Sequence, residues 1–177
     1  MKNLNLCAED AYLALHPQSK SPVGANWPEQ GKSQEDALSA NGNLGLLLGS
    51  KSSVMDVDLD CSEAKALADL ILPVPFATFD RGTPDSGHYL YRTASCGPTK
   101  KFSANGVKST LVELRGDGAQ TMIPPSIHPD GDRLKFTNIN QEASEVEYYD
   151  LLRSVSFLGA CSEIAQLWSS GRRHDLA

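Results

Sequence analysis

The chain has 177 residues, of which 40% are hydrophobic and 21% charged, a composition typical of one globular domain with a substantial core. Its formal net charge is −6, whereas proteins that grip long stretches of nucleic acid are usually basic, so any such strand is expected to be held weakly or with help from other domains. No apolar stretch is long enough to span a bilayer, and the N-terminus lacks the core of a signal peptide, so we expect a cytoplasmic protein with no membrane partner.

The N-terminal part of the chain is expected to be rich in helix and loop. Apolar residues at helical spacing predict a helix over residues 5–15, and prolines and glycines mark residues 16–31 as a loop. Ser33 begins a capping box with Asp36 in the third position after it, which predicts the start of a short helix. Residues 43–49 form an apolar run bounded by glycine, which predicts a buried strand that lies next to the strand after it.

Strands dominate the middle of the chain. After the strand that contains Asp56, strand patterns cover residues 76–79, 88–92, 110–115, 119–123 and 133–137. Gly116, Asp117 and Gly118 predict a hairpin turn within this set. The helical patterns cover residues 61–72, which end before Pro73, and then residues 146–154 and 161–169.

This mixture predicts an α+β fold, with a mostly antiparallel or mixed sheet flanked by helices, because strands and helices do not alternate strictly. We expect one domain over residues 1–177, with a helical and loop part at 1–42, a motif-bearing sheet at 43–140 and C-terminal helices at 141–177. Residues 171–177 resemble the start of a further helix, so we expect a piece of a longer protein. The sequence contains no glycine-rich dinucleotide loop and no P-loop.

The most informative pattern is a row of acids on one strand. Side chains alternate between the two faces of a strand, so Asp56, Asp58 and Asp60 share a face. Like charges at this spacing repel, and a divalent cation that prefers hard oxygen ligands, such as Mg²⁺ or Mn²⁺, removes the repulsion. Taken alone, the pattern also fits a solvated strand face or a strand end that caps the next helix.

Two later segments bear on this interpretation. Ser86, Gly87 and His88 offer a hydroxyl, an approachable backbone and an imidazole at the start of a strand, which suits an anionic group such as a triphosphate. A turn whose histidine simply packs would give the same pattern.

Glu113 lies between aliphatic residues on a strand, where a carboxylate needs a partner. That partner is either a bound ligand or a Lys or Arg on the neighbouring strand, and the pattern also fits a strand face exposed to solvent.

In this order, the three motifs resemble the archaeo-eukaryotic primase superfamily. The closest resemblance is to the N-terminal domain of bifunctional DNA primase/polymerases (prim-pol) of phages, plasmids and mobile elements. Other stretches that resemble this family are Lys20-Ser21-Pro22 with Trp27, residues 43–49, residues 113–118 and residues 124–131. The resemblance spans roughly residues 20–136 and implies a catalytic core with an RRM-like unit and an N-terminal αβ module.

The resemblance also implies a role for each site residue. The catalytic acids, which would bind two Mg²⁺ or Mn²⁺ ions, are Asp56, Asp58 and Glu113. The residues expected to bind the phosphates of an incoming dNTP or NTP are Ser86, His88, Arg115, Lys108 and Arg81. Asp60 is expected to cap the helix at 61–72, and Asp117 to be a turn residue.

The implied reaction is template-directed nucleotidyl transfer by a DNA polymerase, a primase or both. One ion would activate a 3′-hydroxyl and the other would hold the triphosphate. The partners would be a single-stranded DNA template, a primer and the nucleotide, together with a helicase or helical priming domain C-terminal to this chain. The four scattered cysteines argue against an inserted zinc element. Without a following helical domain, primer extension is a safer expectation than primer synthesis.

Three other functions fit the residues. Nucleotide-sugar glycosyltransferases also bind Mn²⁺ and a diphosphate with Asp-x-Asp at a strand end, although this chain lacks a Rossmann-like half before the motif. Metal-dependent nucleases cut phosphodiester bonds with clustered acids. The third alternative is a nucleotide-binding or assembly module without catalysis, against which the three intact motifs argue.

Overall fold

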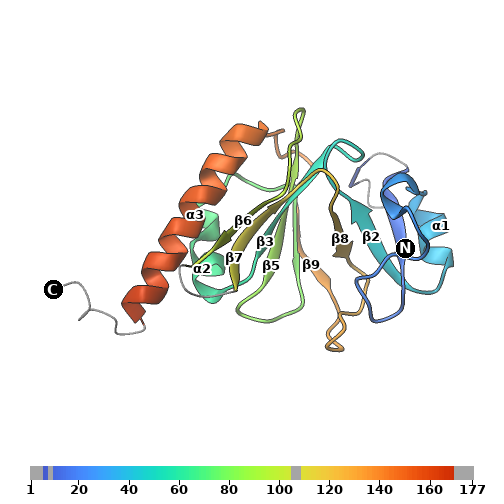
Figure 1. The fold of residues 1–177 in the computed structure, drawn as a ribbon, viewed down its shortest axis with the longest axis horizontal. Helices are drawn as coiled ribbons and strands as arrows, with labels where there is room; N and C mark the ends of the chain where they lie inside the picture. Colours follow the sequence, from blue (N-terminus) through green and yellow to red (C-terminus); the bar gives the residue numbers. More distant parts are fainter. Residues whose placement is uncertain (1–5, 8–9, 105–108, 170–177) are drawn as a thin grey trace.

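The structure is a computed structural model that describes residues 6–7, 10–104 and 109–169. It confirms the α+β class, with two antiparallel sheets in the described part of the chain (Figure 1). The smaller sheet has the order β1-β2-β8, with β1 at Tyr12–Leu15, β2 at Asn43–Leu47 and β8 at Gln120–Ile123. The larger sheet has the order β6-β7-β3-β5-β4-β9, with β6 at Lys100–Ser103, β7 at Thr110–Arg115, β3 at Val54–Leu59, β5 at Gly87–Arg92, β4 at Ala77–Asp80 and β9 at Lys135–Ile139.

The helix predicted for residues 5–15 is wrong, because Tyr12–Leu15 form strand β1. All four residues of β1 are buried, so no polar alternation reveals the strand. Helix α1 (Gln34–Ser39) contacts β1, and its start is as predicted, since the Ser33 hydroxyl accepts a hydrogen bond from the Asp36 amide at 3.1 Å. Trp27–Glu29 add a short 3₁₀ helix, η1, to the expected loop.

Strand pairing differs from the prediction at two places. β2 and β3 belong to different sheets, and so do β7 and β8, although each pair is separated by a short loop. The two connecting loops contact each other: the Ser50 amide and hydroxyl donate to Asp117 Oδ1 at 2.7 and 2.9 Å. Asp117 is therefore a turn residue, as predicted, and it also links the two loops that carry the chain from one sheet to the other. The Gly116–Gly118 turn carries the chain from one sheet to the other instead of closing a hairpin.

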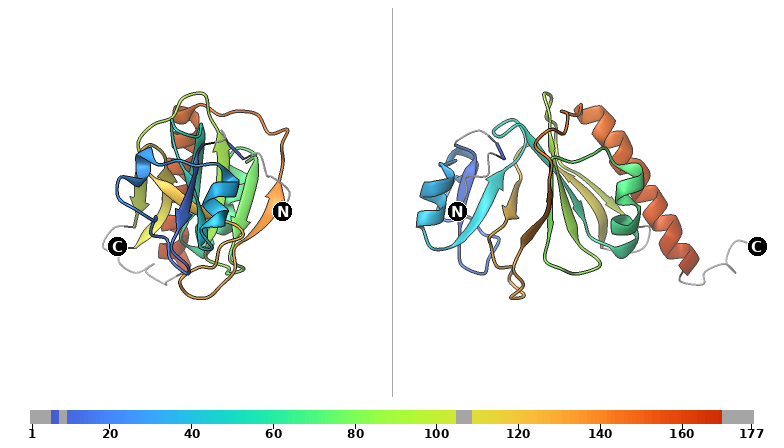
Figure 2. Two further views of the ribbon diagram at one scale, coloured as in Figure 1. Left: turned by 90° about the vertical axis from the view of Figure 1, so that its right-hand side faces the viewer. Right: turned by 180° about the vertical axis from the view of Figure 1, so that it is seen from behind.

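Two helices cover one face of the larger sheet (Figures 1 and 2). Helix α2 (Ser62–Ile71) matches its prediction, but its N-cap is Cys61, whose Sγ accepts from the Ala64 amide, and not Asp60. The two helices expected at 146–154 and 161–169 are a single helix, α3 (Tyr148–Ser169). The residues between the two predicted helices stay helical because Val155 and Leu158 continue the face of α3 that is buried against the larger sheet.

The opposite face of the larger sheet turns toward the smaller sheet (Figure 2, right). Met55, Val57 and Leu59 pack with α2 and α3, which leaves Asp56 and Asp58 on the side of the smaller sheet. The alternation predicted for β3 is therefore confirmed. In the described residues, no helix has the length and apolar character needed to cross a membrane.

Candidate functional site

Asp58 occupies the middle of a row of polar residues across three strands. In the antiparallel register, Asp58 of β3 lies opposite His88 of β5 on one side and opposite Glu113 of β7 on the other. The three side chains are 16%, 18% and 14% exposed, so they are shielded yet reachable from solvent. Residues separated by 30 and 55 positions in sequence thus lie side by side on one face.

Asp56 lies two residues before Asp58, on the same face of β3, and is completely buried. His88 Nδ1 lies 3.0 Å from Asp56 Oδ2, and His88 Nε2 lies 3.6 Å from Asp58 Oδ1. The ring of Phe79 stacks on His88 with a centroid separation of 4.5 Å, which fixes the imidazole plane. His88 therefore contacts both acids of the Asp-x-Asp motif.

The charges of this cluster stabilise one another. Burial alone would lower the pKa of His88, but the charges of Asp58 and Asp56 outweigh burial and raise this pKa to about 9. Burial likewise opposes ionisation of Asp56, but His88 and then Arg115 hold the pKa of Asp56 below its ordinary value. At neutral pH the pair is thus an imidazolium and a carboxylate.

Arg115 joins this cluster to the smaller sheet. Its guanidinium lies 3.6 Å from Asp58 Oδ2 and 3.9 Å from Asp56 Oδ2, and it donates to the Gln120 carbonyl of β8 at 2.7 Å. Arg115 therefore contacts the acids of the larger sheet and also holds Gln120, the first residue of β8 in the smaller sheet.

Glu113 has a basic partner of its own. Lys101 of β6, a strand that the sequence did not predict, places its ammonium 3.5 Å from Glu113 Oε1. This is the cross-strand salt bridge that stood as one alternative for Glu113. In the described part of the chain, no group of three or more His, Cys, Asp or Glu side chains is placed to hold a metal ion.

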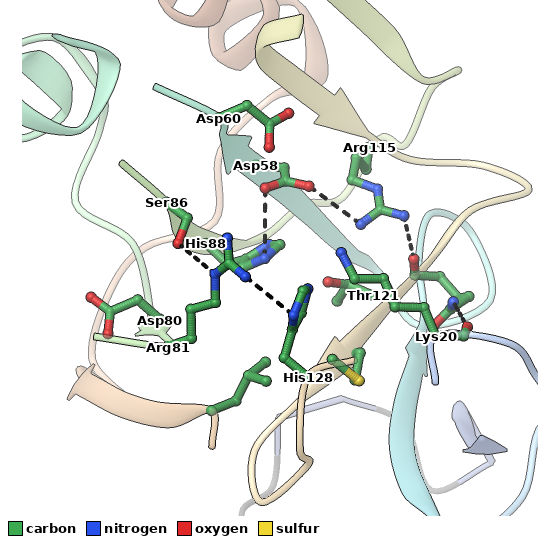
Figure 3. Close-up of a pocket in the computed structure, with 13 residues that line it drawn as sticks. Lys20, Asp58, Asp60, Asp80, Arg81, Ser86, His88, Arg115, Thr121 and His128 are labelled. Carbon is green, nitrogen blue, oxygen red and sulfur yellow. Dashed lines mark hydrogen bonds and ion pairs between the residues drawn. The ribbon is translucent and has the colours of Figure 1, made fainter. Parts of the chain in front are cut away.

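A pocket opens beside this cluster, between the two sheets (Figure 3). One wall comes from the larger sheet and its loops and includes Asp58, Asp60, Arg81, Ser86 and His88. The other comes from the smaller sheet and its loops and includes Lys20, Gln120, Thr121, Met122 and His128. Arg115 lines the pocket where the walls meet, so positive and negative groups converge on the same space.

The loop before β5 brings Ser86 and Arg81 together at the pocket rim. The hydroxyls of Thr83 and Ser86 are 2.6 Å apart, and Arg81 Nε donates to Ser86 Oγ at 3.4 Å. The Arg81 guanidinium also forms an ion pair with Asp130 at 2.5 Å and lies 3.1 Å from His128 Nδ1. Burial, followed by the charges of Lys20 and Arg81, lowers the pKa of His128, so a neutral His128 can accept this contact.

Asp60 is a pocket residue and not a helix cap. Its side chain is exposed, but partial desolvation in the pocket, followed by the nearby charge of Asp58, raises its pKa to about 6. The alternation of β3 had already placed Asp60 on the same face as Asp56 and Asp58, which was the signal for this position.

The structure brings together most of the predicted site residues: Asp56, Asp58, Ser86, His88, Arg81 and Arg115, with Glu113 as the neighbour of Asp58. Lys108 lies outside the described residues. Sequence reasoning missed Lys20 and His128 as pocket residues, although both lie in stretches that carried the family resemblance.

A family model identifies the chain. The model for the N-terminal domain of bifunctional DNA primase/polymerases, Prim-Pol, matches residues 7–147. The chain belongs to the Prim-Pol family. The match contains both sheets, α1 and α2, and every residue of the pocket described above. A comparison with curated proteins found no match. Prim-Pol membership implies DNA and nucleotides as substrates, and nucleotidyl transfer as the class of chemistry.

Proposed function

We propose that this Prim-Pol domain adds nucleotides to a primer on a single-stranded DNA template, using two Mg²⁺ or Mn²⁺ ions held by Asp56, Asp58 and Glu113. The observation that carries the proposal is the position of Asp58 between Glu113 and His88 on three neighbouring strands. This register puts carboxylates, which are suitable ligands for these ions, directly beside a cationic group suited to phosphate.

The residue types fit these ions, because carboxylates are the hard oxygen ligands that Mg²⁺ and Mn²⁺ prefer. In the structure, Asp56 is engaged by His88 and Glu113 by Lys101. Ion binding therefore competes with these pairs. When bound, two such ions lower the pKa of a primer 3′-hydroxyl and neutralise charge on the reacting phosphates.

The phosphates of the incoming nucleotide would lie on the other side of Asp58. His88 supplies an imidazolium donor, Ser86 a hydroxyl, and Arg81 and Arg115 supply guanidinium groups at the pocket wall. These residues position the nucleotide and neutralise its charge, which is the main requirement of phosphoryl transfer. No side-chain nucleophile is needed.

The template would be held with help from another part of the protein, because a chain of net charge −6 attracts DNA weakly. We propose a helicase or a helical priming domain in this role, and a place in phage, plasmid or mobile-element replication.

Extension of a labelled primer on single-stranded DNA tests the proposal, with dNTPs or NTPs and with Mg²⁺, Mn²⁺ or EDTA. We expect extension that EDTA stops and that Asp58→Ala lowers by at least about 100-fold, as for loss of one strong transition-state contact. Asp150→Ala, an exposed acid on α3, is the matched control and should extend like the wild type.

The other outcomes separate the alternatives. Shortening of the primer without nucleotides would favour a nuclease, and release of UDP from UDP-sugars a glycosyltransferase. Nucleotide binding without any product would favour a non-catalytic module. A reaction without primer reports separately on primer synthesis.

A further inference from the structure

The smaller sheet contributes a cation to the pocket that the proposed mechanism has not used. Lys20 lies in the loop after β1 and lines the pocket opposite Asp58 and His88 (Figure 3). Arg81 is paired with Asp130, and Arg115 lies beside Asp58. The Lys20 ammonium, by contrast, forms no hydrogen bond or ion pair with any residue in the described part of the chain.

The loop that carries Lys20 is closed at its base. Leu15 and Pro22 form a bridge between the two ends of the loop, flanked by hydrogen bonds from the His16 amide to the Ser21 carbonyl at 3.0 Å and from the Val23 amide to the Ala14 carbonyl at 2.9 Å. The chain therefore leaves β1 and returns to it within a few residues, which restricts where Lys20 can lie.

Two side chains from the smaller sheet hold the backbone on either side of Lys20. The buried Asn43 of β2 donates to the Ser19 carbonyl at 3.1 Å, and Gln120 of β8 donates to the Lys20 carbonyl at 2.9 Å. Asn43 also donates to the Ile127 carbonyl at 2.7 Å and accepts from the Ile127 amide at 2.9 Å, next to His128. One buried amide thus positions both loops that form this wall.

The surroundings of Lys20 favour an anion. Its charge acts on Asp60 and on His128, and the guanidinium groups of Arg81 and Arg115 line the same pocket. Acids compensate part of the charge of these two guanidinium groups, Asp130 for Arg81 and Asp58 for Arg115, whereas the Lys20 ammonium is available to a ligand with several negative charges. Lys20 can meet such a ligand without giving up an existing ion pair, whereas Arg81 Nη1 is already engaged by Asp130.

We infer that Lys20, supplied by the N-terminal part of the fold and held by Asn43 and Gln120, binds the triphosphate group of the incoming nucleotide. The choice of a nucleoside triphosphate rests on the proposed function. Lysine binds phosphate as a compact charge with three donors, so arginine can replace it here without loss of charge.

Calorimetric titration of the whole chain with Mg²⁺-dATP, and separately with inorganic tripolyphosphate, tests the inference. We expect Lys20→Met to weaken both ligands by about 5- to 20-fold, as for loss of one charged contact at a partly exposed position. Lys20→Arg should remain within about threefold of the wild type. Lys32→Met, at an exposed lysine that forms an isolated bridge with Tyr12 of β1, is the control and should bind like the wild type.

Primer extension in parallel separates this inference from the proposed function. Binding of tripolyphosphate that depends on Lys20, in a protein that extends no primer, would leave the inference standing and remove the proposed reaction. Extension with an unchanged KM for dATP and unchanged affinity in Lys20→Met would overturn the inference alone. Failure of the wild type to bind either ligand would also overturn it. Circular dichroism of each variant checks that the fold is intact.

Discussion

Asp58 and Glu113 lie directly opposite each other on neighbouring antiparallel strands. Carboxylates in such a pair have Cβ atoms about 5 Å apart and destabilise the sheet. Lys101, 3.5 Å from Glu113, offsets part of this repulsion, but its side chain is 62% exposed and its contribution is small. Repulsion between the two carboxylates therefore lowers the stability of the metal-free fold, and a bound cation would remove this repulsion.

This pair predicts that Glu113→Gln stabilises the metal-free protein while it removes activity. The uncharged side chain keeps its shape and ends the repulsion with Asp58, so the free energy of unfolding should rise by about 0.5 kcal/mol. Primer extension should fall by at least about 100-fold. Urea denaturation in EDTA measures the first effect. A loss of stability above 1 kcal/mol would show that the salt bridge with Lys101 outweighs the repulsion.

Asp56→Asn should act on stability in the opposite direction. Asp56 is completely buried and lies within hydrogen-bond distance of His88 and close to Arg115. Loss of its charge leaves two cations near each other with only Asp58 to compensate, and removal of one partner from a buried pair costs about 3 kcal/mol. The same denaturation experiment checks this value. Equal effects of Asp56→Asn and Glu113→Gln would contradict the difference in burial.

The sequence predicted which side chains share the site better than it predicted how the strands connect. Alternation along β3 was enough to place Asp56 and Asp58 on one face, because the period of a strand is two residues. The sheet that each strand joins was not predictable in the same way. A Gly-Asp-Gly turn fits a hairpin and also a crossing between sheets. The contact of Asp117 with Ser50, 67 residues away in sequence, accompanies the crossing here.

The second wall of the pocket was missed for a related reason. Lys20 and His128 reach the pocket because Asn43 binds backbone groups 24 and 84 residues away. No local pattern reports such contacts. The family resemblance did include both stretches, but it gave them no role. The position of this wall depends on long-range hydrogen bonds of the buried Asn43 side chain, which the sequence alone does not reveal.

The ion pair between His88 and Asp56 predicts how stability depends on pH. The pKa of His88 is raised from 6.5 to about 9, so its stabilisation is complete below pH 6.5 and is lost as the pH rises through 9. The pKa of Asp56 is lowered from 3.8, so its contribution is present above pH 3.8 and is lost at lower pH. Both contributions of this ion pair to the free energy of unfolding are therefore present between pH 3.8 and pH 6.5.

Denaturation in EDTA should therefore show a loss of about 2 kcal/mol between pH 6.5 and pH 9 in the wild type, which is absent in His88→Gln. The difference between the two proteins isolates His88 from other titrating groups. A parallel pH dependence in both would mean that His88 keeps its ordinary pKa in the folded protein.

Asn43→Ala should destabilise the fold strongly. The substitution leaves the Ile127 amide and the carbonyls of Ser19 and Ile127 without their partner in a partly buried position. We expect a loss of about 2–4 kcal/mol in the free energy of unfolding. Asn138→Ala, on the exposed strand β9, is the control and should stay within about 0.5 kcal/mol. Equal effects of the two variants would contradict the role given to Asn43.

The two glycines of the Gly116–Gly118 crossing should differ in their tolerance of alanine. A Cβ on Gly116 would lie 2.1 Å from the Gly97 carbonyl oxygen, so backbone must move to admit it. Gly118 has φ +76° but open space around it, so alanine there meets only the strain of the left-handed region, about 1 kcal/mol. Gly116→Ala should cost more than Gly118→Ala, and because Gly116 follows Arg115 it should also lower nucleotide affinity. Urea denaturation and dATP titration of both variants test this order, and a larger loss for Gly118→Ala would show that backbone strain, and not close packing, limits the crossing between the sheets.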